Sequence, residues 1–141
     1  MDVEIEISPT YPENIQKWND EIVLAAHQFN LDPNLIAAVM LQESGGHSNV
    51  ISSSGAIGLM QIMPRDGIAA SFQCVNGPCF NNRPSIDELM NPKFNIQYGA
   101  KMLSGFLAST GSNRAALFAY GPMDIGYRYA DQVVSIYKSN Q

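Results

Sequence analysis

The sequence predicts an all-α domain, and three observations support that prediction. Apolar residues recur at intervals of three and four along several segments, and no segment shows the strict alternation typical of strands. Gly, Pro, Ser and Asn separate these segments, as expected where helices begin and end. The 141 residues are enough for one domain with its own core. We expect about six or seven helices and at most one small β-hairpin.

The composition indicates a folded domain and argues against several classes of function. Hydrophobic residues make up 45% of the chain and charged residues 15%. No apolar run has the length of a membrane span, and no basic and apolar signal peptide is visible at the start. The net charge is −5 and no basic cluster is present, so a nucleic-acid partner has no support.

The chain is expected to begin with a flexible lead, residues 1–9, before the folded domain at 10–141. Thr10 and Glu13 have the spacing of a capping box that would open the first helix. An apolar stripe then follows at helical spacing: Ile15, Trp18, Ile22, Ala25, Ala26 and Phe29. This stripe predicts a helix that packs on the next one.

The next predicted helix carries a carboxyl group on its buried face. Asp32 can cap the helix, Pro33 suits its first turn, and Gly45 would end it. Three apolar residues share a face with Glu43: Ile36, Val39 and Met40. Burial and the negative end of the helix dipole would both raise the pKa of Glu43. A carboxyl group that stays protonated near neutral pH suits a general acid, although a solvent-facing structural Glu fits the same spacing.

The segment from Ser52 to Pro64 is suited to form one wall of a sugar-binding cleft. It places small residues, then Leu-Met, then one amide in what we expect to be a turn and a short helix. Gly55 and Gly58 would let the backbone approach closely, and Gln61 offers two donors and an acceptor.

The following loop contains the two cysteines of the chain. Asn76-Gly77 favours a tight turn, which would bring Cys74 and Cys79 face to face. A disulfide and two free thiols both remain open at this stage. The spacing does not fit a redox or zinc motif, and His27 and His47 stand alone, so we expect no metal site.

The second half of the sequence predicts only helices. Ser85 and Glu88 have the spacing of a second capping box. Asn91-Pro92 would start a long helix that ends near Ser109. Two further helices are expected at 114–120 and at about 126–138, the first capped by Ser112 or Asn113.

Taken together, the motifs resemble those of the soluble lytic transglycosylases, whose fold is similar to goose-type lysozyme. The chain has Glu43-Ser44, then Ser52, then residues 55–64 in the family order Gly-Ala-x-Gly-Leu-Met-Gln-x-Met-Pro. Residues 95–103 and 116–120 match two later family blocks in the same order. The chain departs from the family after Tyr120, where Gly121 stands in place of the usual Asn.

The resemblance implies a lysozyme-like domain that cleaves the β-1,4 bond between N-acetylmuramic acid and N-acetylglucosamine in peptidoglycan. The product would be 1,6-anhydro-muramic acid, and no cofactor would be needed. Glu43 would be the single general acid and base, and Ser52 would help to hold it. The remaining implied substrate-binding residues are Met60, Gln61, Tyr120, which in the family points at the Glu, and Tyr129, which borders the cleft.

Two other functions stay open from the sequence. A goose-type lysozyme would use water in place of the muramic C6 hydroxyl, and a wall-binding module would have lost catalysis. Intact Glu43, Ser52, Gln61 and Tyr120 argue against the module. Under the leading hypothesis the protein is a monomer whose partner is the peptidoglycan glycan strand. It would act outside the cytoplasm, in the periplasm, after secretion or after delivery by a phage.

Overall fold

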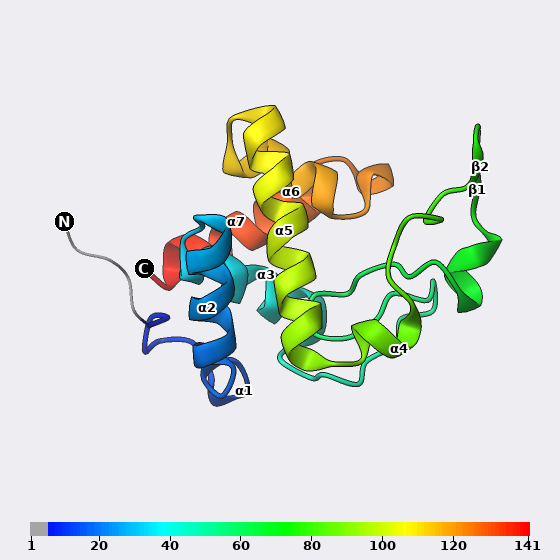
Figure 1. The fold of residues 1–141 in the computed structure, drawn as a ribbon. Helices are drawn as coiled ribbons and strands as arrows, with labels where there is room; N and C mark the ends of the chain where they lie inside the picture. Colours follow the sequence, from blue (N-terminus) through cyan, green and yellow to red (C-terminus); the bar gives the residue numbers. More distant parts are fainter. Residues whose placement is uncertain (1–5) are drawn as a thin grey trace.

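The computed structural model describes residues 6–141 and is built from helices of which the longest, Pro92–Thr110, runs through the middle of the molecule (Figure 1). Within that range it contains seven α-helices, two 3-10 helices and one two-stranded antiparallel hairpin, which confirms the predicted all-α class. The elements are, in order, α1 (Glu13–Gln16), α2 (Asn19–Phe29), α3 (Pro33–Ser44), η1 (Gly67–Ser71), β1 (Gln73–Cys74), β2 (Gly77–Pro78), α4 (Ile86–Leu89), α5 (Pro92–Thr110), α6 (Asn113–Tyr120), η2 (Met123–Ile125) and α7 (Arg128–Ser139). None of these helices is both long and apolar enough to cross a bilayer.

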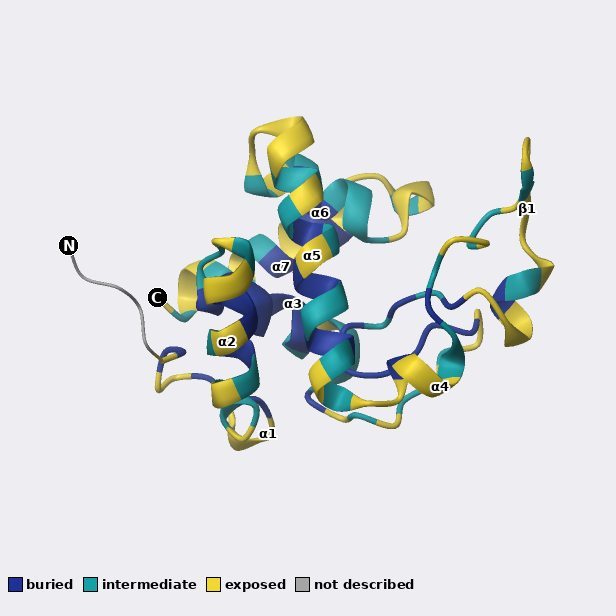
Figure 2. Ribbon diagram, in the orientation of Figure 1, coloured by how far each residue is buried: buried dark blue, intermediate teal, exposed yellow. Residues whose placement is uncertain are grey.

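The helix α3 is the most thoroughly buried helix of the core. It contacts α1, α2 and α7, while α5 contacts α2 and α6. Residues 33–40 of α3 are all buried, as the dark segment in Figure 2 shows. Asp32 caps the helix by accepting the Asn34 N–H at 2.9 Å, and Gly45 ends it with φ of 64°, as predicted.

The expected flexible lead is wrong for its last residues, whereas residues 1–5 lie outside the described part. Ile7 is 3% exposed and belongs to the core. The backbone N–H groups of Ile7 and Ser8 donate to the side-chain oxygens of Asn19 and Asn34, both at 2.8 Å. One apolar residue and two distant amides are therefore enough to fix this segment, and the packed domain begins before residue 10.

The first predicted helix also differs from the observed structure. It is interrupted at Lys17-Trp18, which separates α1 from α2. Thr10 does not cap α1, because its hydroxyl bonds Ser8 and Asn140 instead. The break turns the indole of Trp18 toward the loop after α3, where Nε1 donates to the Gly46 carbonyl at 2.9 Å.

Residues 52–64 form a compact loop in place of the predicted turn and helix. Ile57 is fully buried and forms isolated β-bridges with Ile51 and Ile62. The backbone takes positive φ at Gly55 (92°), Gly58 (76°) and Gln61 (50°). A right-handed helix cannot pass through such positions, and this is the physical reason for the difference.

One buried side chain, Asn95 on α5, attaches this loop to the helical body. Its Oδ1 accepts the Met60 N–H at 2.8 Å, and its Nδ2 donates to the carbonyls of Ile57 and Leu89, both at 2.9 Å. Gly58 leaves room for the amide, since a Cβ there would lie 2.5 Å from Asn95 Nδ2. The loop, α5 and the end of α4 therefore meet at a single amide group.

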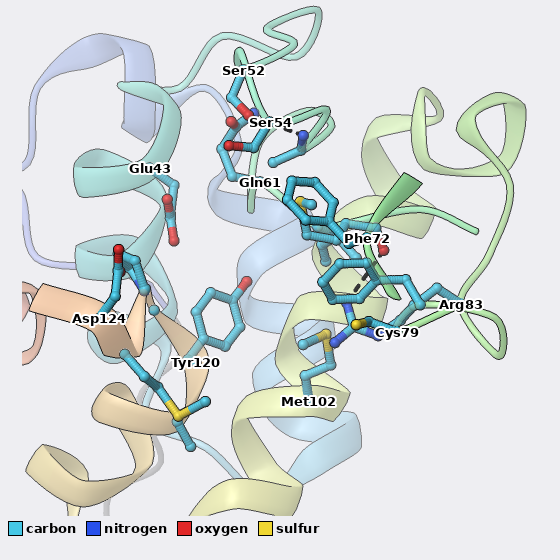
Figure 3. A pocket seen from close by; sticks show the side chains of 18 residues that line it. Glu43, Ser52, Ser54, Gln61, Phe72, Cys79, Arg83, Met102, Tyr120 and Asp124 are labelled. Carbon is cyan, nitrogen blue, oxygen red and sulfur yellow. Dashed lines mark hydrogen bonds between the residues drawn. The ribbon is translucent and has the colours of Figure 1, made fainter. Parts of the chain in front are cut away.

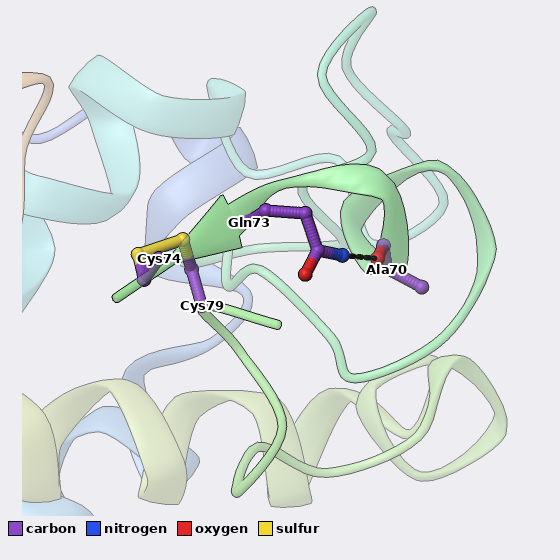
Figure 4. The surroundings of a disulfide bond; sticks show 4 residues. All are labelled: Ala70, Gln73, Cys74 and Cys79. Atoms are coloured by element: carbon purple, nitrogen blue, oxygen red, sulfur yellow. Dashed lines mark hydrogen bonds between the residues drawn. A yellow bond between two sulfur atoms is a disulfide. The ribbon is translucent and has the colours of Figure 1, made fainter. Parts of the chain in front are cut away.

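The hairpin of β1 and β2 projects away from the helices (Figure 1). It is closed by a disulfide (Figure 4). The sulfur atoms of Cys74 and Cys79 are 1.99 Å apart. On either side of the hairpin, the rings of Phe72 and Phe80 meet edge to face with centroids 6.2 Å apart. Beyond it, the capping box of Ser85 and Glu88 is present as predicted.

We predict that Asn95→Ala lowers the free energy of unfolding by about 2–4 kcal/mol, because three buried backbone groups lose their partner. Urea unfolding followed by circular dichroism measures the change. Asn49→Ala is the matched control, since Asn49 is exposed on the preceding loop. Equal stability of the two variants would contradict the role assigned to Asn95.

Candidate active site

A cavity of about 630 Å³ opens between the end of α3, the loop 52–63, the hairpin loop and the end of α6 (Figure 3). Glu43 and Tyr120 lie on one side of it, and Phe72 and Arg83 lie across from them. The lining is mostly apolar, with a few polar and charged groups. This composition is typical of a site that orients a ligand with a small number of polar contacts.

The carboxyl group of Glu43 points into this cavity from the last turn of α3 (Figure 3). Burial raises its pKa from 4.5 to about 7, and a hydrogen bond from Tyr129 partly opposes that rise. The Tyr129 hydroxyl donates to Glu43 Oε2 at 2.8 Å and is its one hydrogen-bond partner within residues 6–141. Near neutral pH the group therefore exists in both protonation states, as a proton donor and acceptor must.

Tyr129 supports Glu43 from behind the cavity wall. Its side chain is 5% exposed and is absent from the cavity lining, so its hydroxyl reaches the cavity only through Glu43. Burial, and then the nearby Glu43 carboxylate, raise the pKa of the Tyr129 hydroxyl, so this hydroxyl stays a neutral donor. Its ring packs on Gly121, where a Cβ would lie 2.2 Å from ring atom Cδ2. The Gly that departs from the family pattern is therefore required by this contact.

Tyr120 lines the same cavity as Glu43, and its hydroxyl makes its hydrogen bond elsewhere. Its hydroxyl donates to the Met60 carbonyl at 2.8 Å. Burial raises the pKa of Tyr120 well above its ordinary value, followed by a contribution from Glu43. Tyr129 bonds the carboxyl group of Glu43, and Tyr120 ties α6 to the loop 52–63.

Of the predicted residues on the loop, Ser52 and Gln61 lie in the cavity and Met60 does not. Ser52 Oγ accepts the Ala56 N–H at 3.0 Å, so it shapes the turn. Gln61 Nε2 donates to the carbonyls of Gly58 at 2.9 Å and Val50 at 3.1 Å. Its amide oxygen has no protein partner in the described part of the chain.

Met60 is a core residue, which corrects its assignment as a substrate contact. Its side chain is 0% exposed and packs against Gly99 of α5, where a Cβ would lie 2.8 Å from Met60 Cβ. The loop turns Met60 inward and the neighbouring Gln61 toward the cavity. Only the backbone of Met60 serves the site, through the hydrogen bonds to Asn95 and Tyr120.

Comparison with known proteins decides the family. The family model described as Transglycosylase SLT domain matches residues 21–125. The chain belongs to this family. In this SLT domain the motif blocks named from the sequence lie on α3, on the loop 52–63, on α5 and on α6. Each of these elements contributes residues to the cavity.

Several relatives are lytic transglycosylases by name. The chain is 40% identical over 90 residues to membrane-bound lytic murein transglycosylase E of Buchnera aphidicola, covering 64% of this chain and 39% of that protein. It is 36% identical over 104 residues to the transglycosylase of Enterobacteria phage PRD1, covering 74% of this chain and 34% of that protein. The chain thus spans less than half the length of these relatives.

A solved structure confirms the lysozyme-like fold class that the resemblance implied. An inactive mutant of lytic transglycosylase Slt from Pseudomonas aeruginosa superposes with a TM-score of 0.57 and 26% identity. The match covers 83% of this chain and 20% of that one.

The sequence analysis missed several cavity residues of the SLT domain, among them Phe72, Phe80, Arg83 and Asp124. Nothing in the sequence pattern of the loop that contains the two cysteines singled out Phe72, Phe80 or Arg83. Asp124 lies on η2 and brings a second carboxylate to the cavity. Within residues 6–141 no group of three or more His, Cys, Asp or Glu could hold a metal ion.

We predict that kcat/KM for wall lysis falls as the pH rises through about 7, because Glu43 loses its proton there. The hydrogen bond from Tyr129 lowers the pKa of Glu43, so Tyr129→Phe should move this descending limb to higher pH. Tyr127→Phe is the control, since Tyr127 is exposed and stacks on Phe118. A limb that moves to lower pH in Tyr129→Phe would refute the assignment.

Proposed function

We propose that this SLT domain is a peptidoglycan lytic transglycosylase that cleaves the β-1,4 bond between N-acetylmuramic acid and N-acetylglucosamine. The observation that carries the proposal is the Glu43 carboxyl group, which faces the cavity with a pKa raised to about 7. Membership of the SLT family and the names of its relatives support the same chemistry. The site is assembled from one chain, so the domain can act as a monomer.

In the proposed reaction Glu43 acts twice: it first donates a proton and later takes one back from another group. The protonated carboxyl group first donates to the glycosidic oxygen, the bond from C1 of muramic acid to that oxygen breaks, and the N-acetylglucosamine end leaves. The sugar's own N-acetyl group stabilises the positive charge at C1, as the family resemblance implies. The Glu43 carboxylate then takes the proton of the muramic C6 hydroxyl, whose oxygen attacks C1 and closes the 1,6-anhydro ring. Glu43 ends protonated, and no water is consumed.

The tethered C6 hydroxyl is favoured as the nucleophile for a kinetic reason. A well-oriented group on the same molecule can have an effective concentration of ~10⁵ M or more, far above that of bulk water. Phe72, Phe80 and Tyr120 line the cavity and limit the room for water beside C1.

A hydrolytic outcome is the second candidate, and Asp124 is the observation that favours it. Hydrolysis by two carboxyl groups needs one acid and one base that activates water. Asp124 lines the same cavity as Glu43 and is exposed, so its side chain is placed where it could accept a proton from water. This would make the domain a muramidase of the goose-type lysozyme class.

The proposed substrate also sets the place of action. Peptidoglycan lies outside the cytoplasmic membrane, so the domain would act in the periplasm, after secretion or after delivery by a phage. Relatives named as membrane-bound and as a phage protein are consistent with either delivery route.

We predict that Glu43→Gln lowers the rate of wall lysis by ~10²–10⁴-fold or more while the fold is kept. Turbidity of purified walls measures the loss. The pKa of Glu43 is 4.5 in the unfolded chain and about 7 in the folded protein, so ionisation of Glu43 lowers the stability of the folded state as the pH rises from 4.5 to about 7. The amide removes this effect, so the variant should be at least as thermally stable as wild type above pH 7. Lysis at the wild-type rate by folded Glu43→Gln would end the assignment.

We predict that digestion of walls yields mainly anhydro-muropeptides, which are one water lighter than hydrolysis products and lack a reducing end. Mass spectrometry of the digest measures the ratio of the two products. Asp124→Asn should leave the anhydro product dominant and remove any hydrolytic fraction. If wild type yields mainly reducing-end muramic acid and Asp124→Asn abolishes it, the muramidase function takes the place of the transglycosylase.

A further inference from the structure

A second groove continues the active-site cavity along the outer face of α5. It measures about 400 Å³, and Arg83 and Met102 line both spaces. From this shared boundary it follows α5 past Lys101 to Phe106. Figure 3 shows Arg83 and Met102 on the side of the cavity away from Glu43. A ligand at the reacting bond can therefore extend into the groove without leaving the protein surface.

The groove is positively charged in a protein whose net charge is −5. Arg83 and Lys101 line it and no carboxyl group does. Neither cation forms a salt bridge with the rest of residues 6–141. Arg83 packs over the ring of Phe80 at 5.2 Å and donates one N–H to the Met63 carbonyl at 3.3 Å, so its planar fork is held in place with donors to spare. Lys101 lies 5.9 Å over the ring of Tyr98.

We infer that this groove binds the carboxylates of the peptide stem carried by the muramic acid beside the cleaved bond. The inference rests on the proposed function, because it extends the same substrate into a neighbouring space. The peptide stem is joined to the lactyl group of muramic acid by an amide bond. It carries free carboxylates several bonds away from the sugar. The guanidinium of Arg83 is held in place and can bind a carboxylate with two parallel hydrogen bonds. The flexible ammonium of Lys101, in the same groove, can bind a second carboxylate.

A sugar-binding groove is the competing occupant. Tyr98 and Phe106 offer aromatic faces on which sugar rings could stack. However, neutral sugars give no reason for two unpaired cations in one groove of an acidic protein. The charge therefore favours the peptide stem, and the sugar becomes an outcome of the test.

The test compares glycan strands that keep their peptide stems with the same strands after an amidase has removed them. The readout is the ratio of kcat/KM for the two substrates, which cancels general losses of activity. Wild type should prefer stem-bearing strands. Lys101→Gln should reduce the preference about 2- to 5-fold, as for an exposed charge pair, and Lys101→Glu should reduce it further. Arg83→Gln should reduce it about tenfold or more, since its contact is partly enclosed.

Lys93 provides the matched control for Lys101. It lies on the first turn of the same helix, is exposed and lines neither space. Lys93→Gln and Lys93→Glu should keep the wild-type ratio. Added salt should weaken the preference of wild type, because the Debye length falls to ~10 Å at 0.1 M ionic strength.

A binding measurement separates failure of the groove from failure of the proposed function. A soluble muramyl tripeptide is titrated into Glu43→Gln protein, followed by the amide and Nζ resonances of Lys101, with its carboxamide analogue as the uncharged probe. Binding of the acid form alone supports the groove even if no strand is cleaved, in which case only the proposed function fails. Equal cleavage of both strand types, with no binding of the tripeptide, overturns the groove and leaves the proposed function standing. An equal loss on both strand types in Lys101→Gln, with no tripeptide binding, assigns the groove to sugar and also overturns the inference.

Discussion

The burial of the Glu43 carboxyl group depends on the helix that carries it. Residues 33–40 of α3 are enclosed on every side, so the helix cannot shift without disturbing the whole core. Only the last turn reaches a cavity, and there the carboxyl group accepts a hydrogen bond from one protein hydroxyl, that of Tyr129. Burial therefore raises its pKa to about 7, and the single hydrogen bond keeps that rise moderate. The chemistry of the site follows from the packing of one helix.

The cavity wall formed by the loop 52–63 depends on a different constraint, the hydrogen bonds of the Asn95 amide. The loop 52–63 has little regular structure, and the positive φ of Gln61, which is uncommon for a residue with a side chain, persists only in a setting that holds it. Asn95 supplies that setting with three hydrogen bonds, and Tyr120 adds a fourth to the Met60 carbonyl. Because Tyr120 also lines the cavity, the loop and α6 are fixed by the same contact that shapes the site.

Local signals in the sequence predicted where helices begin and end. Contacts between residues far apart in the sequence could not be predicted in this way. Asp32, Ser85 and Asn91 cap helices through groups within three residues, so short motifs identified them. The bond from Tyr129 to Glu43 joins residues 86 apart. Asp124 reaches the cavity only because the chain turns after Tyr120. No local pattern encodes such pairs, and the family resemblance did not indicate which tyrosine would bond the carboxyl group.

Gly121, where the chain departs from the family pattern, leaves room for the Tyr129 ring. The Tyr129 ring lies where a side chain at position 121 would be, so Gly121 and Tyr129 fit only as a pair. With the ring in that position, its hydroxyl reaches Glu43 and stays a neutral donor because it is buried. Tyr120 is then free to bond the Met60 carbonyl and hold the loop. The α7 helix that carries Tyr129 is itself tied to α6 by Arg114 and Asp131 at 2.7 Å. The environment of the Glu43 carboxyl group is thus set by the last two helices of the chain as well as by its own.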